Sequence, residues 1–145
     1  MAAYEYYERK INYYETDKMS IVHHSNYARF LEEARIDLME HYNLPFAQLE
    51  DRGYMIPVLE LQGSFIEAVR FGETVRIYVY IDTVTSARFK FKYKIFDAKT
   101  GKLKHTAESS HCIIDSEFRP VAFKRLPQDL KDRLEYMLNV HPKAQ

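Results

Sequence analysis

A chain of 145 residues with 46% hydrophobic and 29% charged residues has the size and composition of a globular domain, which excludes disordered, collagen-like and low-complexity proteins. Its 21 Lys and Arg residues balance its 21 Asp and Glu residues, so no overall positive field attracts nucleic acid. Because a neutral chain does not repel its own copies, we expect an oligomer.

The start of the chain and its cysteine content predict the compartment. Residues 1–5 lack the positive segment and apolar run of a signal peptide, and the single Cys112 cannot form an internal disulfide. No apolar run approaches the ~18 residues that a membrane helix needs. No repeat or flexible linker divides the chain. We therefore expect one cytoplasmic domain over residues 1–145, with no membrane span.

The first third of the chain predicts a strand followed by one long helix. Residues 6–14 are aromatic and β-branched, as in a strand, and residues 15–17 end it. Ser25 and Asn26 are both good N-cap residues for a helix of about four turns that runs through His41. Apolar residues recur at helical spacing along it and cover a wide arc, which predicts a helix enclosed on several sides.

The rest of the chain predicts an antiparallel sheet. Aliphatic or aromatic residues alternate with polar ones at a period of two, so each strand has one buried and one wet face. The order of elements is not the strand–helix alternation of a parallel dinucleotide-binding fold. We expect an α+β fold, in which a curved antiparallel sheet wraps around the long helix. The expected strands are 55–68, 74–85, 88–95 and 102–115, with short helices over 46–51 and after Pro127.

One polar loop carries the groups best suited to chemistry. Residues 14–27, YETDKMSIVHHSNY, hold a carboxylate and two imidazoles and lead directly into the long helix. The first turn of a helix presents free N–H donors and a partial positive charge, which stabilise a carbonyl oxygen as it becomes an oxyanion. An acyl-transfer site also needs a base or nucleophile, and Asp17 and His24 can supply these roles.

This loop resembles that of the hotdog-fold acyl-CoA thioesterases of the 4-hydroxybenzoyl-CoA and Tol–Pal-associated type. Asp17 falls on the family's catalytic aspartate, His24 on its active-site histidine, and Tyr27 on its helix-start tyrosine. Ser20 departs from the pattern, because the family usually has Gly there, and His23 stands where Tyr is common. If that Gly serves a positive φ, Ser20 costs on the order of 1–2 kcal/mol.

The resemblance implies a single hotdog domain that hydrolyses an acyl-CoA thioester to a free acid and coenzyme A. Asp17 would act as nucleophile or as general base, and both roles stay open. The amides near His24 and Ser25 would hold the oxyanion, and His24 would orient the thioester or move a proton. No cofactor or metal is expected, because a thioester is already activated. Family members pair their sheets, which implies a homodimer or homotetramer.

The substrate-binding residues follow from the same comparison. Tyr27, His23 and Ser25 would line the site. Coenzyme A carries phosphates, and a cationic strip that begins with Arg88 and Lys90 and continues through Lys92 and Lys94 lies on one face of one strand. Alternating lysines are more often a solvated face or protect a sheet edge, so this alternative stays open.

Other interpretations were weighed against thioester hydrolysis. His41, His105, His111 and His141 show no metal-ligand spacing, and Cys112 lies in a strand pattern typical of a small buried residue. The alternative functions are a hotdog-fold hydratase or dehydratase of acyl thioesters, and a non-catalytic module that binds acyl-CoA or an acyl-carrier protein. The acyl group itself, and the choice between coenzyme A and carrier protein, are left open.

Overall fold

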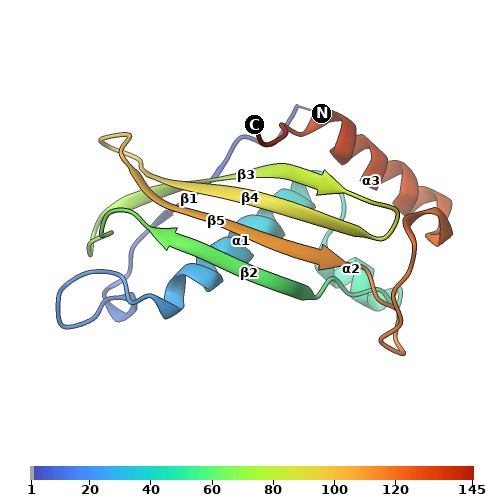
Figure 1. The fold of residues 1–145 in the computed structure, drawn as a ribbon, viewed down its shortest axis with the longest axis horizontal. Helices are drawn as coiled ribbons and strands as arrows, with labels where there is room; N and C mark the ends of the chain where they lie inside the picture. Colours follow the sequence, from blue (N-terminus) through green and yellow to red (C-terminus); the bar gives the residue numbers. More distant parts are fainter. Residues whose placement is uncertain (1) are drawn as a thin grey trace.

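The computed structural model describes residues 2–145. Five strands form one antiparallel sheet in the order β1-β3-β4-β5-β2, and the long helix α1 crosses one face of it (Figure 1). This arrangement confirms the predicted α+β architecture, with the sheet curved around a single long helix. The elements are β1 (Tyr7–Lys10), α1 (Ser25–His41), α2 (Phe46–Asp51), β2 (Val58–Phe65), β3 (Thr74–Val84), β4 (Arg88–Asp97), β5 (Leu103–Cys112) and α3 (Gln128–Val140), with 3-10 turns at Tyr13–Glu15 and Phe123–Arg125.

The core lies between α1 and the inner face of the sheet. Leu31, Ala34 and Leu38 on α1 are at most 1% exposed, and so are Ile77 of β3 and Ile95 of β4. Buried and part-exposed residues alternate along β3 and β4, as the period-two pattern predicts. Removal of this apolar surface from water is the main force that holds the helix on the sheet.

Strand β2 forms one edge of the sheet and is exposed along its whole length. It pairs on one side with β5, and all eight of its residues are exposed. Two of its large apolar residues, Leu61 and Phe65, lie opposite Ser109 and His105 of β5 and are 46% and 61% exposed. An apolar sheet edge with free backbone groups is a surface for pairing with another strand.

Strand β1 is shorter than the predicted strand over residues 6–14. The strand ends at Lys10, and a 3-10 turn follows at Tyr13–Glu15. The carboxylate of Glu15 accepts hydrogen bonds from the Asn12 amide at 2.8 Å and from both terminal nitrogens of Arg9 at 2.7 and 2.8 Å. Burial opposes the charge of Glu15, but these donors outweigh it and hold its pKa below the usual value. The chain therefore turns early and fixes the polar loop.

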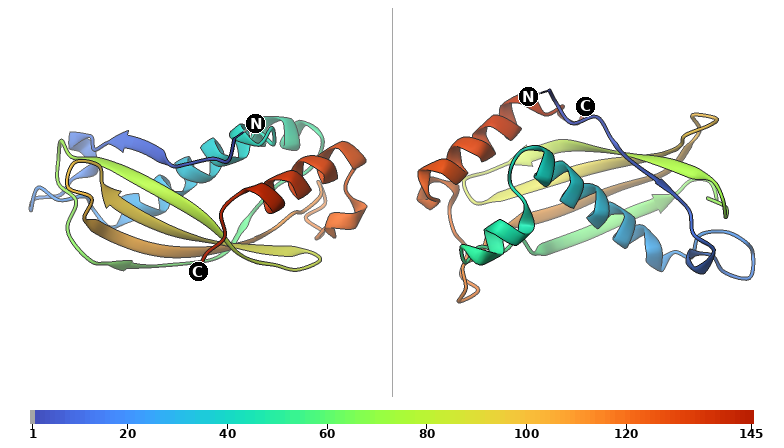
Figure 2. Two further views of the ribbon diagram at one scale, coloured as in Figure 1. Left: turned by 90° about the horizontal axis from the view of Figure 1, so that it is seen from above. Right: turned by 180° about the vertical axis from the view of Figure 1, so that it is seen from behind.

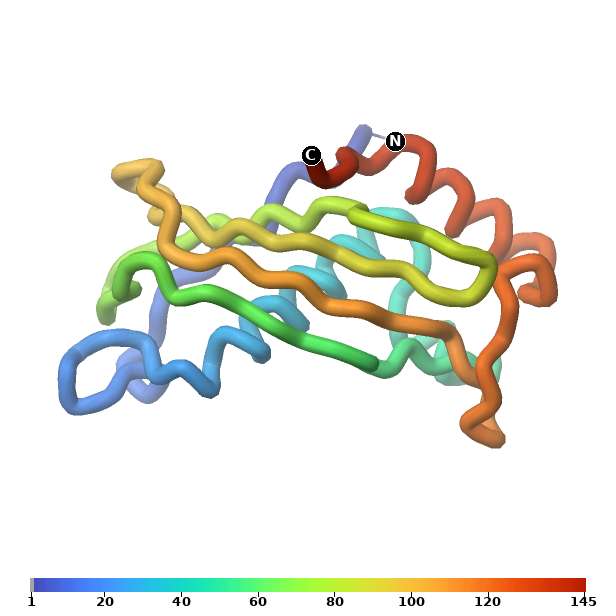
Figure 3. Tube along the Cα trace, viewed as in Figure 1, coloured from blue at the N-terminus to red at the C-terminus, as the bar shows by residue number. Residues whose placement is uncertain are grey.

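The far end of the core is closed by α2, α3 and the C-terminal tail. Leu130, Leu134 and Met137 of α3 are buried, and α3 lies over the β3–β4 hairpin end of the sheet, on the same side as α1 (Figure 2). The tail returns to β3, where His141 Nε2 bonds the carbonyl of Val79 at 2.6 Å. The two ends of the chain consequently lie near each other, away from the polar loop (Figure 3). Within residues 2–145, no helix has the length and apolarity needed to cross a membrane.

Candidate active site

The polar loop forms a tight hairpin before α1. Thr16 and Val22 face each other as an antiparallel bridge, and the amide of Asp17 donates to the carbonyl of Ile21 at 2.9 Å. Ser20 occupies the turn with a φ of 63°, in the left-handed region that favours glycine. The position at which the thioesterases usually have Gly therefore has a positive φ in this chain, where it is occupied by serine.

Asp17 is half-buried at the base of this hairpin. Its Oδ1 atom accepts a hydrogen bond from the Met19 amide at 2.8 Å, which orients the carboxylate within the turn. Within residues 2–145, Oδ2 has no hydrogen-bond partner. The carboxylate is thus held by one oxygen, and the other is available to a substrate or a water molecule.

The first turn of α1 offers one unpaired amide. The Ser25 amide donates to His23 Nδ1 at 3.2 Å, the Asn26 amide to the carbonyl of His23 at 2.9 Å, and the Tyr27 amide to that of His24 at 3.3 Å. In the part of the chain that the structure describes, the His24 amide donates to no acceptor. That N–H remains at the positive end of the helix dipole and is free to bind an oxygen atom.

The two histidines lie together at this helix start. Their rings are 4.1 Å apart, and both side chains are exposed. His24, rather than Ser25 or Asn26, is the residue that caps α1, and its own side chain accepts no capping hydrogen bond. The prediction that Ser25 or Asn26 is the N-cap is wrong, because both side chains bond other groups. Ser25 Oγ bonds His23 Nδ1 at 2.8 Å, and the side-chain Nδ2 of Asn26 donates to the carbonyl of Glu15 at 2.9 Å.

An aromatic cluster of the buried Tyr27 and His105 and the exposed Phe65 joins α1 to β5 and β2. Tyr27 is 6% exposed, and its ring centre is 4.5 Å from that of His105 and 4.9 Å from that of Phe65. Burial lowers the pKa of His105 to about 4, so its imidazole is neutral at pH 7. The spacing of the histidines excluded His105 as a metal ligand, and no pattern in the sequence predicted another role for it. Gly63, an isolated glycine within a strand, was the available signal, since such a glycine often marks the close approach of another group.

A series of buried polar groups links α1, through β4 and β5, to the residue before β2. Arg35 donates to the Tyr93 hydroxyl at 3.2 Å, which bonds Ser109 Oγ at 2.5 Å, and Ser109 Oγ bonds His111 Nε2 at 2.7 Å. This series of hydrogen bonds ends at the bond between His111 Nδ1 and the carbonyl of Pro57, at 3.1 Å. Burial, together with the charge of Arg35, lowers the pKa of His111 to about 4. These bonds satisfy polar groups that would otherwise be costly to bury.

The cationic strip lies apart from the hairpin in a single chain. Lys90, Lys92 and Lys94 point away from α1, because the residues that alternate with them form the core. Arg88 lies at the β3–β4 hairpin, at the opposite end of the sheet from the polar loop (Figure 1). The structure brings His23, His24 and Ser25 into contact at the start of α1, with Asp17 in the preceding hairpin and Tyr27 in the first turn of the helix. It does not bring Arg88 or Lys90 to them within one chain.

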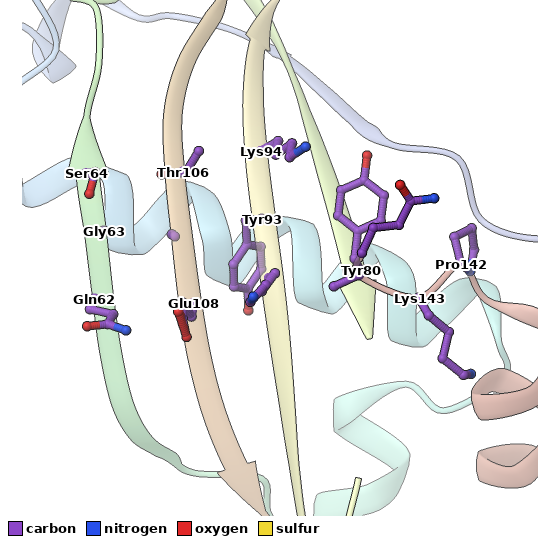
Figure 4. Close-up of a pocket in the computed structure, with 14 residues that line it drawn as sticks. Gln62, Gly63, Ser64, Tyr80, Tyr93, Lys94, Thr106, Glu108, Pro142 and Lys143 are labelled. Atoms are coloured by element: carbon purple, nitrogen blue, oxygen red, sulfur yellow. The ribbon is translucent and has the colours of Figure 1, made fainter. Parts of the chain in front are cut away.

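Part of the strip lines a hollow of about 710 Å³ on the outer face of the sheet. Lys94, Tyr80 and Glu108 border it, and Lys143 approaches from the C-terminal tail (Figure 4). Lys92 also lines it and lies 3.9 Å from the carboxylate of Asp82. The hollow and the polar loop are on different faces of the sheet, so they are separate surfaces of one chain.

Comparison with known proteins gives one family for this chain. The model of the thioesterase-like superfamily matches residues 11–134. YneP of Bacillus subtilis (strain 168), provisionally named an acyl-CoA thioesterase, is 30% identical over 119 residues, which cover 81% of this chain and 86% of YneP.

Solved structures show the same fold at similar identity. A DHNA-CoA thioesterase from Staphylococcus aureus is 27% identical with a TM-score of 0.85, and the match covers 93% of this chain and 91% of that one. A hypothetical protein, TT1821 from Thermus thermophilus, is 32% identical with a TM-score of 0.83, over 92% and 99% of the two chains. The likeness extends over nearly the whole domain, including the hairpin and the start of α1.

Proposed function

The chain belongs to the thioesterase-like superfamily and has its hotdog fold, and on that premise we propose that it hydrolyses an acyl-CoA thioester to a free acid and coenzyme A. Relatives that match over most of the chain bear the names of an acyl-CoA thioesterase and a DHNA-CoA thioesterase. Thioester hydrolysis is therefore the chemistry that the family favours. The narrower 4-hydroxybenzoyl-CoA or Tol–Pal-associated type stays a prediction, since the relatives compared carry other names.

The observation that carries the proposal is the unpaired amide of His24 at the start of α1, which follows a hairpin whose Asp17 carboxylate has one free oxygen. The next three amides of α1 are occupied, so the first turn presents one donor for an oxyanion. A donor in such a site contributes about 2.7–4 kcal/mol to the stability of the transition state. Asp17, fixed in the preceding hairpin, supplies the negative charge that a base or nucleophile needs.

In the proposed reaction, the thioester carbonyl carbon is attacked and the thiolate of coenzyme A leaves. If Asp17 is the base, it takes a proton from water as the water oxygen bonds the carbon; if it is the nucleophile, an anhydride forms and water then cleaves it. The His24 amide would hold the oxyanion, and the His24 ring would orient the thioester or move a proton. The residues suffice without a metal or organic cofactor, because thiolates are good leaving groups.

We also propose that the active form is a homodimer or homotetramer joined at β2. Antiparallel pairing of two β2 edges about a two-fold axis places the start of one strand beside the end of its partner. The end of β2 leads to Val69, whose carbonyl accepts the Val22 amide of the polar loop at 2.8 Å. The start of β2 lies at the end of the sheet that carries Arg88, since Val58 faces His111 and Arg88 faces Cys112.

This pairing offers a role for the cationic strip. The polar loop of one subunit would lie at the same end as Arg88 and Lys90 of its partner. The phosphates of coenzyme A could then be bound by one subunit while the thioester lies at α1 of the other. Such a shared site would explain why the predicted residues lie far apart in one chain.

The test of the function is release of free thiol from a panel of acyl-CoA esters, followed with a thiol-reactive dye. The panel should contain short, branched, long and aromatic acyl groups, and acyl-carrier protein esters should be compared with it. We expect Asp17→Asn to lower kcat/KM by roughly 10²–10⁴, because a positioned base or nucleophile is lost. Thermal unfolding and binding of coenzyme A should remain as in the wild type.

The alternative functions give different results in the same assays. A hydratase or dehydratase would convert enoyl-CoA to hydroxyacyl-CoA, or the reverse, without thiol release. A binding module would bind the esters and release nothing. Wild-type turnover that Asp17→Asn leaves unchanged would remove Asp17 from the mechanism. Lys18→Asn, which changes an exposed residue of the same hairpin, serves as the control.

The strip is tested by Lys90→Ala combined with Lys92→Ala. We expect a KM for acyl-CoA raised several-fold and less dependent on salt, because two cations near the phosphates are removed. Lys99→Ala combined with Lys102→Ala changes the charge equally at an exposed turn on the other end of the sheet and should leave the KM unchanged. If the two double variants have the same KM for acyl-CoA, the cationic strip is a solvated face and does not bind coenzyme A.

A further inference from the structure

His105 is a buried imidazole with no hydrogen bond in a region otherwise rich in them. The side chain is 2% exposed, and its Nδ1 atom has no partner within residues 2–145. Over the same residues, Nε2 makes no hydrogen bond either, although it is not among the fully buried atoms. His111, which pairs with Val58 near the end of the same strand, has both nitrogens satisfied. Since buried polar groups in proteins are nearly always paired, His105 calls for an explanation.

The space that His105 occupies is left open by a glycine. A Cβ atom on Gly63 would lie 2.7 Å from Nε2 and 2.9 Å from Cε1 of the imidazole, closer than real contacts allow. Any other residue at position 63 would therefore displace the ring. Gly63 itself is exposed on the edge strand, so the Nε2 edge of the ring lies just beneath the surface of β2.

The ring is held in a fixed orientation and in one charge state. Tyr27 lies 4.5 Å from it on one side, and Phe65 lies 4.9 Å from it at the edge of the sheet. Burial keeps the imidazole neutral at pH 7, so one nitrogen carries a hydrogen and the other does not. A buried N–H without a partner is rarer than a buried acceptor without one. This difference favours the tautomer with the hydrogen on Nε2 rather than on the fully buried Nδ1.

His105 also lies deeper than the groups proposed to act on the thioester. His23, His24 and Ser25 are exposed at the rim, whereas Tyr27 and His105 are buried behind them. A ligand atom that reaches Nε2 would thus belong to the acyl group rather than to the thioester carbonyl at the start of α1.

We propose, on the basis of the proposed thioesterase function, that His105 is a specificity-determining residue that donates its Nε2–H to an oxygen of the acyl group. The substrate class is then an acyl-CoA whose acyl group carries a hydroxyl or keto oxygen. Gly63 lets the ring lie against the edge strand, where a side chain at this position would displace it. Tyr27 and Phe65 hold the donor in place, so that an acyl group without the oxygen leaves the N–H unpaired.

The experiment compares matched acyl-CoA esters that differ by one oxygen: 3-hydroxybutanoyl with butanoyl, and 4-hydroxybenzoyl with benzoyl. In the wild type, we expect at least one pair to favour the oxygen-bearing ester in kcat/KM. His105→Phe keeps a ring between Tyr27 and Phe65 but removes the donor. It should lower that preference at least tenfold, mainly through the activity on the oxygen-bearing ester.

Two further variants separate recognition from packing. His105→Gln retains an N–H donor and should keep part of the preference, and Gly63→Ala should lose it by pushing the imidazole aside. Thr106→Val, on the neighbouring residue that faces the outer hollow, is the control and should keep the full preference. A preference that His105→Phe leaves unchanged in both pairs, or a wild type with no preference in either, would overturn the proposal.

If the chain is not a thioesterase, the assays give a result that differs from a failure of the His105 proposal. In that case the wild type would release no thiol from any ester. Calorimetric binding of the non-hydrolysable thioether analogues of the same four esters would then test His105 alone. Affinities that favour the oxygen-bearing analogue in the wild type but not in His105→Phe would support it, and equal changes for both would refute it.

Discussion

Strands β3 and β2 belong to one sheet, but within one chain only β3 is paired with strands on both sides and has one buried face. In β3, buried residues alternate with part-exposed ones, and Ile77 is fully buried beneath α1. In β2, every residue is exposed, and the apolar Leu61 is 46% exposed. The difference arises because β3 has neighbouring strands on both sides and a helix across one face, whereas β2 has a strand on one side alone.

This contrast separates what holds the domain together from what remains to be paired. The residues under α1 provide the stability of the folded chain, as in any close-packed interior. The β2 edge instead presents apolar side chains and unpaired backbone groups beside the polar loop and the His105 cluster. The parts proposed to act on a substrate therefore lie at the unfinished side of the sheet, where a second subunit can complete them.

The largest expected effect distinguishes the two strands directly. Ile77→Ala should lower the free energy of unfolding by about 2–5 kcal/mol, because it leaves a cavity in the core. Leu61→Ala should change it by about 0.5 kcal/mol or less at protein concentrations low enough to keep the chains apart. Chemical denaturation of both variants measures the difference. Similar losses in the two strands would show that β2 is already packed within one chain.

A charge on the β2 edge should break association rather than folding. Leu61→Lys places a cation where two edges would meet, and we expect the dissociation constant of the oligomer to rise at least tenfold, about 1.4 kcal/mol. Sedimentation velocity over a range of concentrations measures this change. Val84→Lys, at a 40% exposed residue near the end of β3, is the matched control. A dimer that tolerates Leu61→Lys but not Val84→Lys would place the interface elsewhere.

The smallest effect concerns the hairpin that holds Asp17. Ser20→Gly relieves a left-handed conformation that costs about 1–2 kcal/mol, while the freer unfolded chain takes back about 0.4–1 kcal/mol. The net gain in unfolding free energy should be about 0.5–1 kcal/mol. Lys18→Gly, at a residue of the same hairpin without positive φ, should lose stability instead. A loss in both variants would mean that Ser20 is held by contacts that outweigh its strain.

Much of the fold could be predicted from periodicity along the chain. The helical spacing of apolar residues predicted α1 through His41, and the period of two predicted β3 and β4 to within two residues at each end. The first strand was predicted too long, since residues 11–14 have strand-like composition but the Arg9–Glu15 pair turns the chain after Lys10. That pair joins residues six apart in the sequence, which no local pattern shows.

The candidate site was predicted in part. The carboxylate and imidazole spacing singled out Asp17 and His24, and the structure places their hairpin directly before α1. His105 was missed as a part of this region, because its neighbours Tyr27 and Gly63 come from other elements. The alternation of basic residues along one strand predicted the cationic strip. Its distance from the polar loop could not be predicted, because that distance depends on how the strands are arranged in the sheet.

The sequence by itself determined the type and order of the elements, because hydrophobic periodicity and turn residues act on neighbours along the chain. It also determined which loop carries ionisable groups into a helix start. Only the tertiary structure decided that β2 is an open edge, that the His24 amide is unpaired, and that His105 lies beneath Tyr27. Each of these depends on which elements pack together, and burial and hydrogen bonding are settled by distance in space rather than by separation in sequence.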